Sequence, residues 1–112
     1  MKAAFCYVTC PSKEEALDIA RTLMEERLIA CANVLPDMMA IYRWQGAVHE
    51  ASEVVLILKT SPSLAERVSE RVQALHSYEC PCVAVLPVTA GNLAYLDWIA
   101  AETAGESSTL DS

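Results

Sequence analysis

Apolar residues recur along this chain with two different periods, and the changes of period divide it into predicted strands and helices. Residues 3–10 are apolar on both alternating faces, as in a strand that is buried on both sides. From about residue 12 to 27, apolar side chains recur every three or four positions, which predicts an amphipathic helix. Ser12 and Glu15 have the spacing of a capping box at the start of this helix. The first predicted elements are therefore a strand and a helix.

The middle of the chain predicts a hairpin. An apolar strand over residues 29–35 ends at Pro36, and a second extended stretch covers residues 38–44. Gly46 supplies the conformational freedom that a tight turn needs, and the return strand runs from about residue 47 to 60. The return strand is long for a small domain, so we expect the hairpin to extend beyond the sheet.

The last third of the chain predicts a second helix, a strand and a third helix. Ser63 and Glu66 have the spacing of a capping box for the second helix. Residues 82–88 form an apolar strand, and a short last helix follows it. Residues 105–112 carry no apolar pattern and are expected to form a frayed tail, which leaves a single domain over residues 1–104.

This order of elements is typical of a ferredoxin-like α+β sandwich, β-α-β-β-α-β with a short C-terminal helix. Both main helices would pack on one face of an antiparallel sheet of four strands. Residues 54–58 (VVLIL) are apolar on both faces, and Cys6 and Val8 are expected to add to the apolar surface of the open face. Because such a surface is unfavourable in water, the pattern predicts that subunits associate sheet against sheet, with the last helix covering part of the face.

Composition and charge narrow the classes of function. The chain has 112 residues, of which 54% are hydrophobic, and its net charge is −7. This charge argues against binding to nucleic acid or to an anionic membrane surface, but not against binding a cation. No apolar run reaches the length of a transmembrane helix, and the N-terminus lacks the pattern of an export signal. The five cysteines are an odd number, so they favour free thiols in a reducing cytoplasm.

The segment HSYECPC, from His76 to Cys82, concentrates residue types that bind metals. Cys80 and Cys82 are two positions apart, so on an extended chain their thiols point the same way and could chelate a soft ion such as Cu or Zn. His76 follows a predicted helix, where it is either a capping or surface residue or an imidazole ligand. These donors fall short of the four ligands of a closed zinc site, so water or another subunit would complete it. Buried thiols with no ligand role are the alternative.

A second set of residues suits a small-molecule pocket. Lys59 follows the apolar run of the return strand and requires a carboxylate or a bound anion as its partner. It would make either a structural salt bridge, for which Glu53 and Glu79 are candidates, or an anion site between subunits. Tyr78, Trp44 and Trp98 would either line this inter-subunit pocket or pack in the core.

Several motifs resemble those of the CutA family of divalent-cation tolerance proteins. They are ERLIACANVLP (26–36), YRWQG (42–46), ILKT (57–60), HSYECP (76–81), VLPV (85–88), GN (91–92) and YLDWI (95–99). The resemblance covers nearly the whole chain, with the motifs in the right order. It implies a ferredoxin-like fold, a homotrimer in the cytoplasm and a role in tolerating copper and other divalent cations.

The resemblance also bears on the candidate ligands. Family members place a histidine where His76 stands, and they often have a glutamate where this chain has Cys82. A thiolate at that position would favour a softer metal than a carboxylate does. Some members carry a cysteine at the position of Val8, so Cys10, two residues further along the same strand face, is a displaced candidate ligand.

Three functions follow as hypotheses. The first is a homotrimeric protein that binds Cu or Zn in the response to metal ions. The implied fold and trimer are also similar to those of the PII signalling proteins, so a sensor that binds a small anionic metabolite between subunits is the alternative, and a structural scaffold is the third. The sequence contains no supported nucleophile–base pair, no phosphate-binding glycine loop and no H-E-x-x-H motif, so we expect no catalytic activity and no organic cofactor.

Overall fold

One antiparallel sheet of four strands, in the spatial order β2-β3-β1-β4, organises the protein. A computed structural model describes the backbone of residues 2–111 and the side chains of residues 2–103. The elements in chain order are β1 (Ala3–Cys10), α1 (Lys13–Glu25), β2 (Cys31–Trp44), β3 (Ala47–Thr60), the 3-10 turn η1 (Pro62–Leu64), α2 (Ala65–Leu75), β4 (Val83–Val88) and α3 (Leu93–Asp111). This order confirms the predicted ferredoxin-like α+β class.

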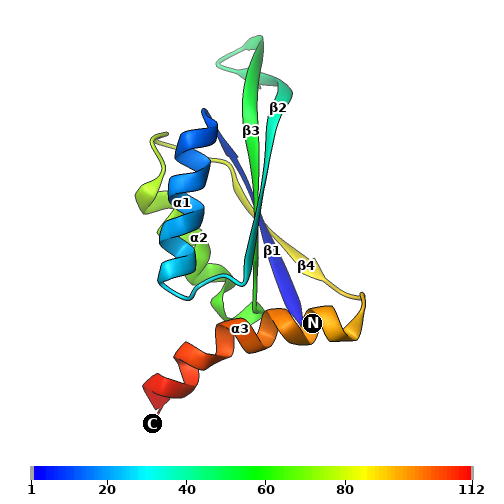
Figure 1. The fold of residues 1–112 in the computed structure, drawn as a ribbon. Helices are drawn as coiled ribbons and strands as arrows, with labels where there is room; N and C mark the ends of the chain where they lie inside the picture. The colour runs from blue at the N-terminus through cyan, green and yellow to red at the C-terminus, as the bar shows by residue number, and fades with distance from the viewer. Residues whose placement is uncertain (1, 112) are drawn as a thin grey trace.

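The main hydrophobic core lies between the sheet and the helices α1 and α2. Figure 1 shows both helices on the same side of the sheet. The buried side chains of this core include Cys6 and Val8 from β1, Leu56 and Leu58 from β3, Ile19 and Leu23 from α1, and Val68 and Val72 from α2. Cys6 and Val8 therefore belong to the helix-covered face, and the prediction that they add to the open face is wrong. Alternation showed that they share a face, but only helix packing decides which face is covered.

The opposite face of the sheet, here called the outer face, is only partly covered. Phe5, Ile57 and Lys59 lie on it, because they alternate with the core residues of their strands. At one end, Leu96 and Ile99 of α3 form a second buried cluster with Ala3 and Ala30, against which Phe5 and Val88 pack. Figure 1 shows α3 crossing this end of the sheet. The last helix thus covers part of the outer face, as expected.

The β2–β3 hairpin extends well beyond the rest of the sheet (Figure 1). β1 pairs only with residues 54–60 of β3, so the segment 47–53 pairs with β2 alone. At the turn, Gln45 has a φ of 49° and Gly46 a φ of 80°, the pair of positive values that a type I′ hairpin requires. The predicted overhang is confirmed.

β2 is one strand rather than two stretches separated at Pro36. A bulge interrupts its register between Leu35 and Met38, and Asp37 adopts a φ of 63° there. Proline is tolerated at this bulge because β2 is an edge strand. The bulge lets the hairpin continue to Trp44.

The structure forms one of the two predicted helix caps and not the other. Ser12 caps α1, since its Oγ accepts a hydrogen bond from the backbone N–H of Glu15 at 3.1 Å. The second predicted capping box is not formed, because Ser63 lies inside the turn η1 and the N-cap of α2 is Leu64, which has no side-chain cap bond. Pro62 begins this turn before Ser63 is reached, so the serine is past the position of a cap.

The last helix is longer than the sequence indicates. The helical backbone of α3 continues from Leu93 to Asp111, through most of the stretch predicted as a tail over residues 105–112. Side chains from residue 104 onward and residue 112 itself lie outside the described part of the structure. Alanine and glutamate, which are good helix formers, follow Ile99 and can prolong a helix without an apolar stripe.

Candidate functional site

The segment from His76 to Cys82 connects α2 to β4 and packs against the end of β1. The His76 side chain is fully buried. Its Nε2 lies 2.8 Å from the carbonyl oxygen of Thr9, and its Nδ1 accepts a hydrogen bond from the backbone N–H of Tyr78 at 3.0 Å. Because Nδ1 accepts, the proton of the neutral ring is on Nε2, which donates to Thr9.

His76 therefore joins two distant parts of the backbone. Thr9 belongs to β1, while Tyr78 lies in the same connecting segment as the histidine. Both ring nitrogens are engaged, so neither offers a free lone pair to a metal ion in this arrangement. The predicted role of His76 as a ligand would require the bond from Tyr78 to be given up.

Glu15 of α1 also holds this segment and was not among the sequence candidates. Its Oε2 accepts hydrogen bonds from both the backbone N–H and the Oγ of Ser77, each at 3.0 Å, and lies 3.4 Å from Nδ1 of His76. The sequence suggested a local capping role for Glu15. No local pattern indicates a contact between residues 62 positions apart.

The five cysteines fall into different environments. Cys6 and Cys10 are completely buried in the core, and burial raises the pKa of each thiol to about 11. For Cys10, the nearby charges of Glu15 and Glu53 contribute to this rise in the pKa, after burial. Since the thiolate is the metal-binding form, Cys10 is a poor ligand in this position. Cys80 and Cys82 are exposed free thiols.

Cys80 and Cys82 line the same cavity, which has a volume of about 330 Å³. Thr9 of β1, Glu53 of β3 and Tyr78 also line it. The hydroxyl of Tyr78 donates to Glu53 Oε2 at 3.5 Å, and burial followed by the charge of Glu53 raises the pKa of this tyrosine. The structure thus brings Cys80 and Cys82 together with one carboxylate.

A neighbouring cavity of about 490 Å³ lies between the hairpin and the same segment. Its lining residues are Tyr42, Trp44, Tyr78, Glu79 and Cys80. Three residues predicted for an inter-subunit pocket, Trp44, Tyr78 and Glu79, are therefore together on one chain. Tyr42, which also lines this cavity, was not predicted as a member.

The other two residues predicted for that pocket lie elsewhere. Lys59 Nζ donates to the hydroxyl of Tyr95 at 2.9 Å and lies 5.2 Å from the centre of the Phe5 ring. Trp98 stacks on Tyr95, with ring centroids 5.9 Å apart. Within one chain, the predicted set is thus divided into two groups, and Lys59 makes no salt bridge with a carboxylate among the described side chains.

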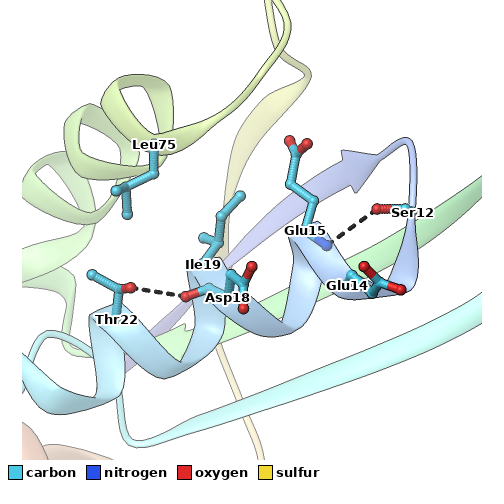
Figure 2. A pocket seen from close by; sticks show the side chains of 7 residues that line it. All are labelled: Ser12, Glu14, Glu15, Asp18, Ile19, Thr22 and Leu75. Carbon is cyan, nitrogen blue, oxygen red and sulfur yellow. Dashed lines mark hydrogen bonds between the residues drawn. The ribbon is translucent and has the colours of Figure 1, made fainter.

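A further cavity, of about 340 Å³, follows α1 on the helical side of the protein. Figure 2 shows its lining residues, with the carboxylates of Glu14 and Glu15 pointing apart. The lining residues are Ser12, Glu14, Glu15, Asp18, Ile19, Thr22 and Leu75. It contains no thiol or imidazole, so the predicted metal chemistry does not belong there.

Within residues 2–103, no group of three or more histidine, cysteine, aspartate or glutamate side chains is arranged to hold a metal ion. One chain therefore supplies the exposed thiols of Cys80 and Cys82 without a complete set of ligands.

No helix of the described part is both long and apolar enough to cross a membrane.

Comparison with known proteins decides the family. The model of the CutA1 divalent ion tolerance protein family matches residues 4–102. The chain belongs to the CutA family. The CutA divalent-cation tolerance protein of Thermus thermophilus is 47% identical over 96 residues, which cover 86% of this chain and 93% of the relative.

Solved CutA structures have the same fold. The Thermus thermophilus protein superimposes with a TM-score of 0.86 at 44% identity, covering 90% of this chain and 98% of that one. CutA from Xylella fastidiosa gives a TM-score of 0.87 at 35% identity and covers 92% and 99% of the two chains. The human CutA protein is 40% identical over 93% of this chain, which spans 58% of the human relative.

The names of CutA relatives point to different compartments. The protein of Arabidopsis thaliana is called chloroplastic, and that of Archaeoglobus fulgidus is called periplasmic. The cytoplasmic location inferred from the cysteines of this CutA chain therefore stays a prediction.

Proposed function

We propose that this CutA protein contributes to divalent-cation tolerance by binding a soft metal ion, Cu or Zn, through Cys80 and Cys82. The observation that carries the proposal is that these two exposed free thiols line one cavity. Thiolates are the ligands that soft and borderline metals prefer. The names of the relatives, which refer to divalent cations, support a metal ion as the ligand.

The remaining ligands of this proposed site would come from nearby groups. Glu53 lines the same cavity and carries a carboxylate. Water or a second subunit would complete the coordination, because two sulfurs and one oxygen leave a tetrahedral site open. His76 and Cys10 are not needed in this form of the site, since one is engaged on both nitrogens and the other is in the core.

We expect the parent protein to bind one Cu(I) or Zn(II) per subunit in a competition titration with a coloured chelator under reducing conditions. Replacing both Cys80 and Cys82 by serine removes both sulfur ligands. Loss of a residue that only hydrogen-bonds to a metal ligand lowers metal affinity by ~10–100-fold. We expect the loss of two ligands to lower the affinity by more than that.

The matched control is Cys31→Ser, because Cys31 is a partly buried free thiol that lines neither cavity. It should titrate like the parent. Equal affinity of the double variant and the parent would rule out Cys80 and Cys82 as the metal site.

We also propose that the protein acts as a homotrimer. Support comes from large apolar side chains that one chain leaves exposed, many of them on the hairpin. They are Leu35, Met39, Ile41, Tyr42, Trp44, Val48 and Leu86. Because exposed apolar surface is unfavourable in water, other copies of the chain are the economical cover.

Sedimentation velocity at micromolar concentration is expected to give the mass of three chains. Ile41 is 67% exposed in one chain, so Ile41→Glu should lower this mass without unfolding the subunit. Leu93→Glu, at a residue of α3 that is 62% exposed, is the control and should leave the mass unchanged. A parent that sediments as a stable monomer would refute the trimer.

The alternative of a sensor for a small anionic metabolite has weaker support. Its key residue, Lys59, is already bonded to Tyr95 and lies apart from the cavity of Trp44, Tyr78 and Glu79. A structural scaffold has no specific marker. We propose a reducing compartment, in keeping with the five cysteines that are free here, and no catalytic role.

A further inference from the structure

Glu15 of α1 holds the start of the segment that carries the exposed thiols. Its Oε2 accepts two hydrogen bonds from Ser77, one from the backbone N–H and one from Oγ, each at 3.0 Å. Nδ1 of His76 lies 3.4 Å from the same oxygen but already accepts the Tyr78 N–H, so the neutral ring donates nothing to Glu15. The contact of Glu15 with the segment therefore depends on the two bonds from Ser77.

The N-terminal cap of α1 fixes the part of the helix from which Glu15 projects. Ser12 Oγ accepts a hydrogen bond from the backbone N–H of Glu15 at 3.1 Å. In a complete capping box, the glutamate side chain would in turn accept from the backbone N–H of the capping serine. The Glu15 carboxylate accepts from Ser77, 62 positions further along the chain. A side chain that is typical of local capping thus makes a long-range contact.

The thiol segment depends on such contacts because it lacks regular structure. From Ser77 to Cys82, the backbone forms neither a helix nor a strand, and the two thiols are exposed. The hydroxyl of Tyr78 reaches Glu53 at 3.5 Å, which is long for a hydrogen bond between oxygens. Ser77 lies three residues before Cys80. The direction in which the chain leaves Ser77 therefore influences where both thiols lie.

We propose that Glu15 is a positioning residue for the Cys80–Cys82 pair: by holding Ser77, it keeps both thiols on one cavity, where they bind one soft ion. This inference rests on the proposed function, since it concerns the same two ligands. Binding through two sulfurs is favoured when their spacing is set before the ion arrives, because less conformational entropy is then lost. An ionised acceptor also makes stronger hydrogen bonds than a neutral one.

The contact between Glu15 and Ser77 lies away from the outer face of the sheet. The helices α1 and α2 cover the opposite face (Figure 1). Glu15 lines the cavity along α1 together with Leu75, the last residue of α2. Association of subunits through the outer face therefore leaves this contact as it is in one chain, and its role is testable in the native oligomer.

The first test repeats the competition titration for Cu(I) or Zn(II) with two Glu15 variants. Glu15→Ala removes the acceptor of both Ser77 bonds and should weaken metal binding about three- to tenfold, less than loss of a direct partner of a ligand. Glu15→Gln keeps an oxygen that can accept from Ser77 but loses the charge, so its affinity should lie between those of Glu15→Ala and the parent.

The matched control is Glu14→Ala. Glu14 is in the same first turn of α1, and its carboxylate points away from that of Glu15 (Figure 2). The substitution removes the same charge from the same turn without touching Ser77. It should therefore bind metal like the parent.

A positioning role also predicts an effect that a general loss of stability does not produce. In a Cys82→Ser chain only one of the two sulfurs remains, so their relative placement no longer matters. Glu15→Ala should then change the residual metal affinity by less than about twofold. An equal loss of affinity with one thiol and with two would overturn the positioning role. Urea denaturation in chelator verifies that each variant is folded under the titration conditions.

A metal-free probe separates this inference from the proposed function. Monomethylarsonous acid forms one As–S bond to each of two thiols and releases two molecules of water, so its uptake reports thiols that meet at one atom. The native oligomer of a Cys31→Ser chain competes for it with a small dithiol, and mass spectrometry measures the uptake. We expect Glu15→Ala to bind the arsenical about three- to tenfold more weakly than this parent, and Glu14→Ala to bind it equally well.

The outcomes distinguish the two proposals. If neither metal binds while arsenical uptake depends on Glu15, the metal function fails and the positioning role stands. If Glu15→Ala binds the arsenical as tightly as the parent, the positioning role fails, whether or not metal binds. Absence of arsenical uptake by the parent would overturn it too, since the thiols would not act as a pair.

Discussion

Replacing His76 by alanine is expected to destabilise the protein by about 2–4 kcal/mol in metal-free buffer. The change removes the donor to the Thr9 carbonyl and the acceptor of the Tyr78 N–H, and it leaves a void where a fully buried ring was. An unpaired buried polar group costs about 1–3 kcal/mol, and the void adds to that cost. Urea denaturation with a chelator present measures the change.

The control for this prediction is His49→Ala. His49 is exposed on the hairpin and stacks only on Tyr42, so its loss should cost less than about 1 kcal/mol. If His76 served only as a metal ligand, its replacement would leave the metal-free protein as stable as the parent. That result would contradict the structural role derived from its two backbone bonds.

Replacing Leu56 by alanine should cost about 2–5 kcal/mol of unfolding free energy. Leu56 is 0% exposed and sits in the core between the sheet and the two helices. Truncation removes buried apolar area and leaves a cavity that the packed neighbours fill only in part. Denaturant unfolding at one fixed protein concentration is the measurement, since association would make stability depend on concentration.

Leu86→Ala is the matched control because Leu86 is on the outer face and 49% exposed. In an isolated chain, its truncation should cost about 1 kcal/mol or less. A loss as large as that at Leu56 would contradict this expectation and would indicate that another copy of the chain covers the outer face.

The elements of the fold were largely predictable because hydrophobic periodicity is a local property. Alternation in β1 and the three-four spacing in α1 each report on one element, and the order of elements then restricts the topology. The overhang of the hairpin was predictable from strand length. The bulge after Leu35 was not predictable, because a proline such as Pro36 is compatible both with the end of a strand and with a bulge in an edge strand.

The candidate site shows where sequence patterns stop being sufficient. The spacing of Cys80 and Cys82 predicted that both thiols point the same way, and both residues line one cavity in the structure. The sequence also indicated Cys10 as a candidate thiol ligand, but Cys10 lies in the core. The five residues assigned to one pocket divide between two ends of the sheet. The type of a side chain, aromatic or charged, does not show which distant side chains it contacts.

The sequence by itself determined the fold class, the family and the segment in which the exposed thiols lie. These depend on local spacing and on motifs that remain recognisable without any long-range contact. Only the tertiary structure decided that His76 bonds to the backbone of Thr9, 67 positions away, and that Glu15 reaches Ser77. It also decided that Trp44 and Tyr78 line one cavity, because the packing of the hairpin against the segment before β4 sets which side chains lie together.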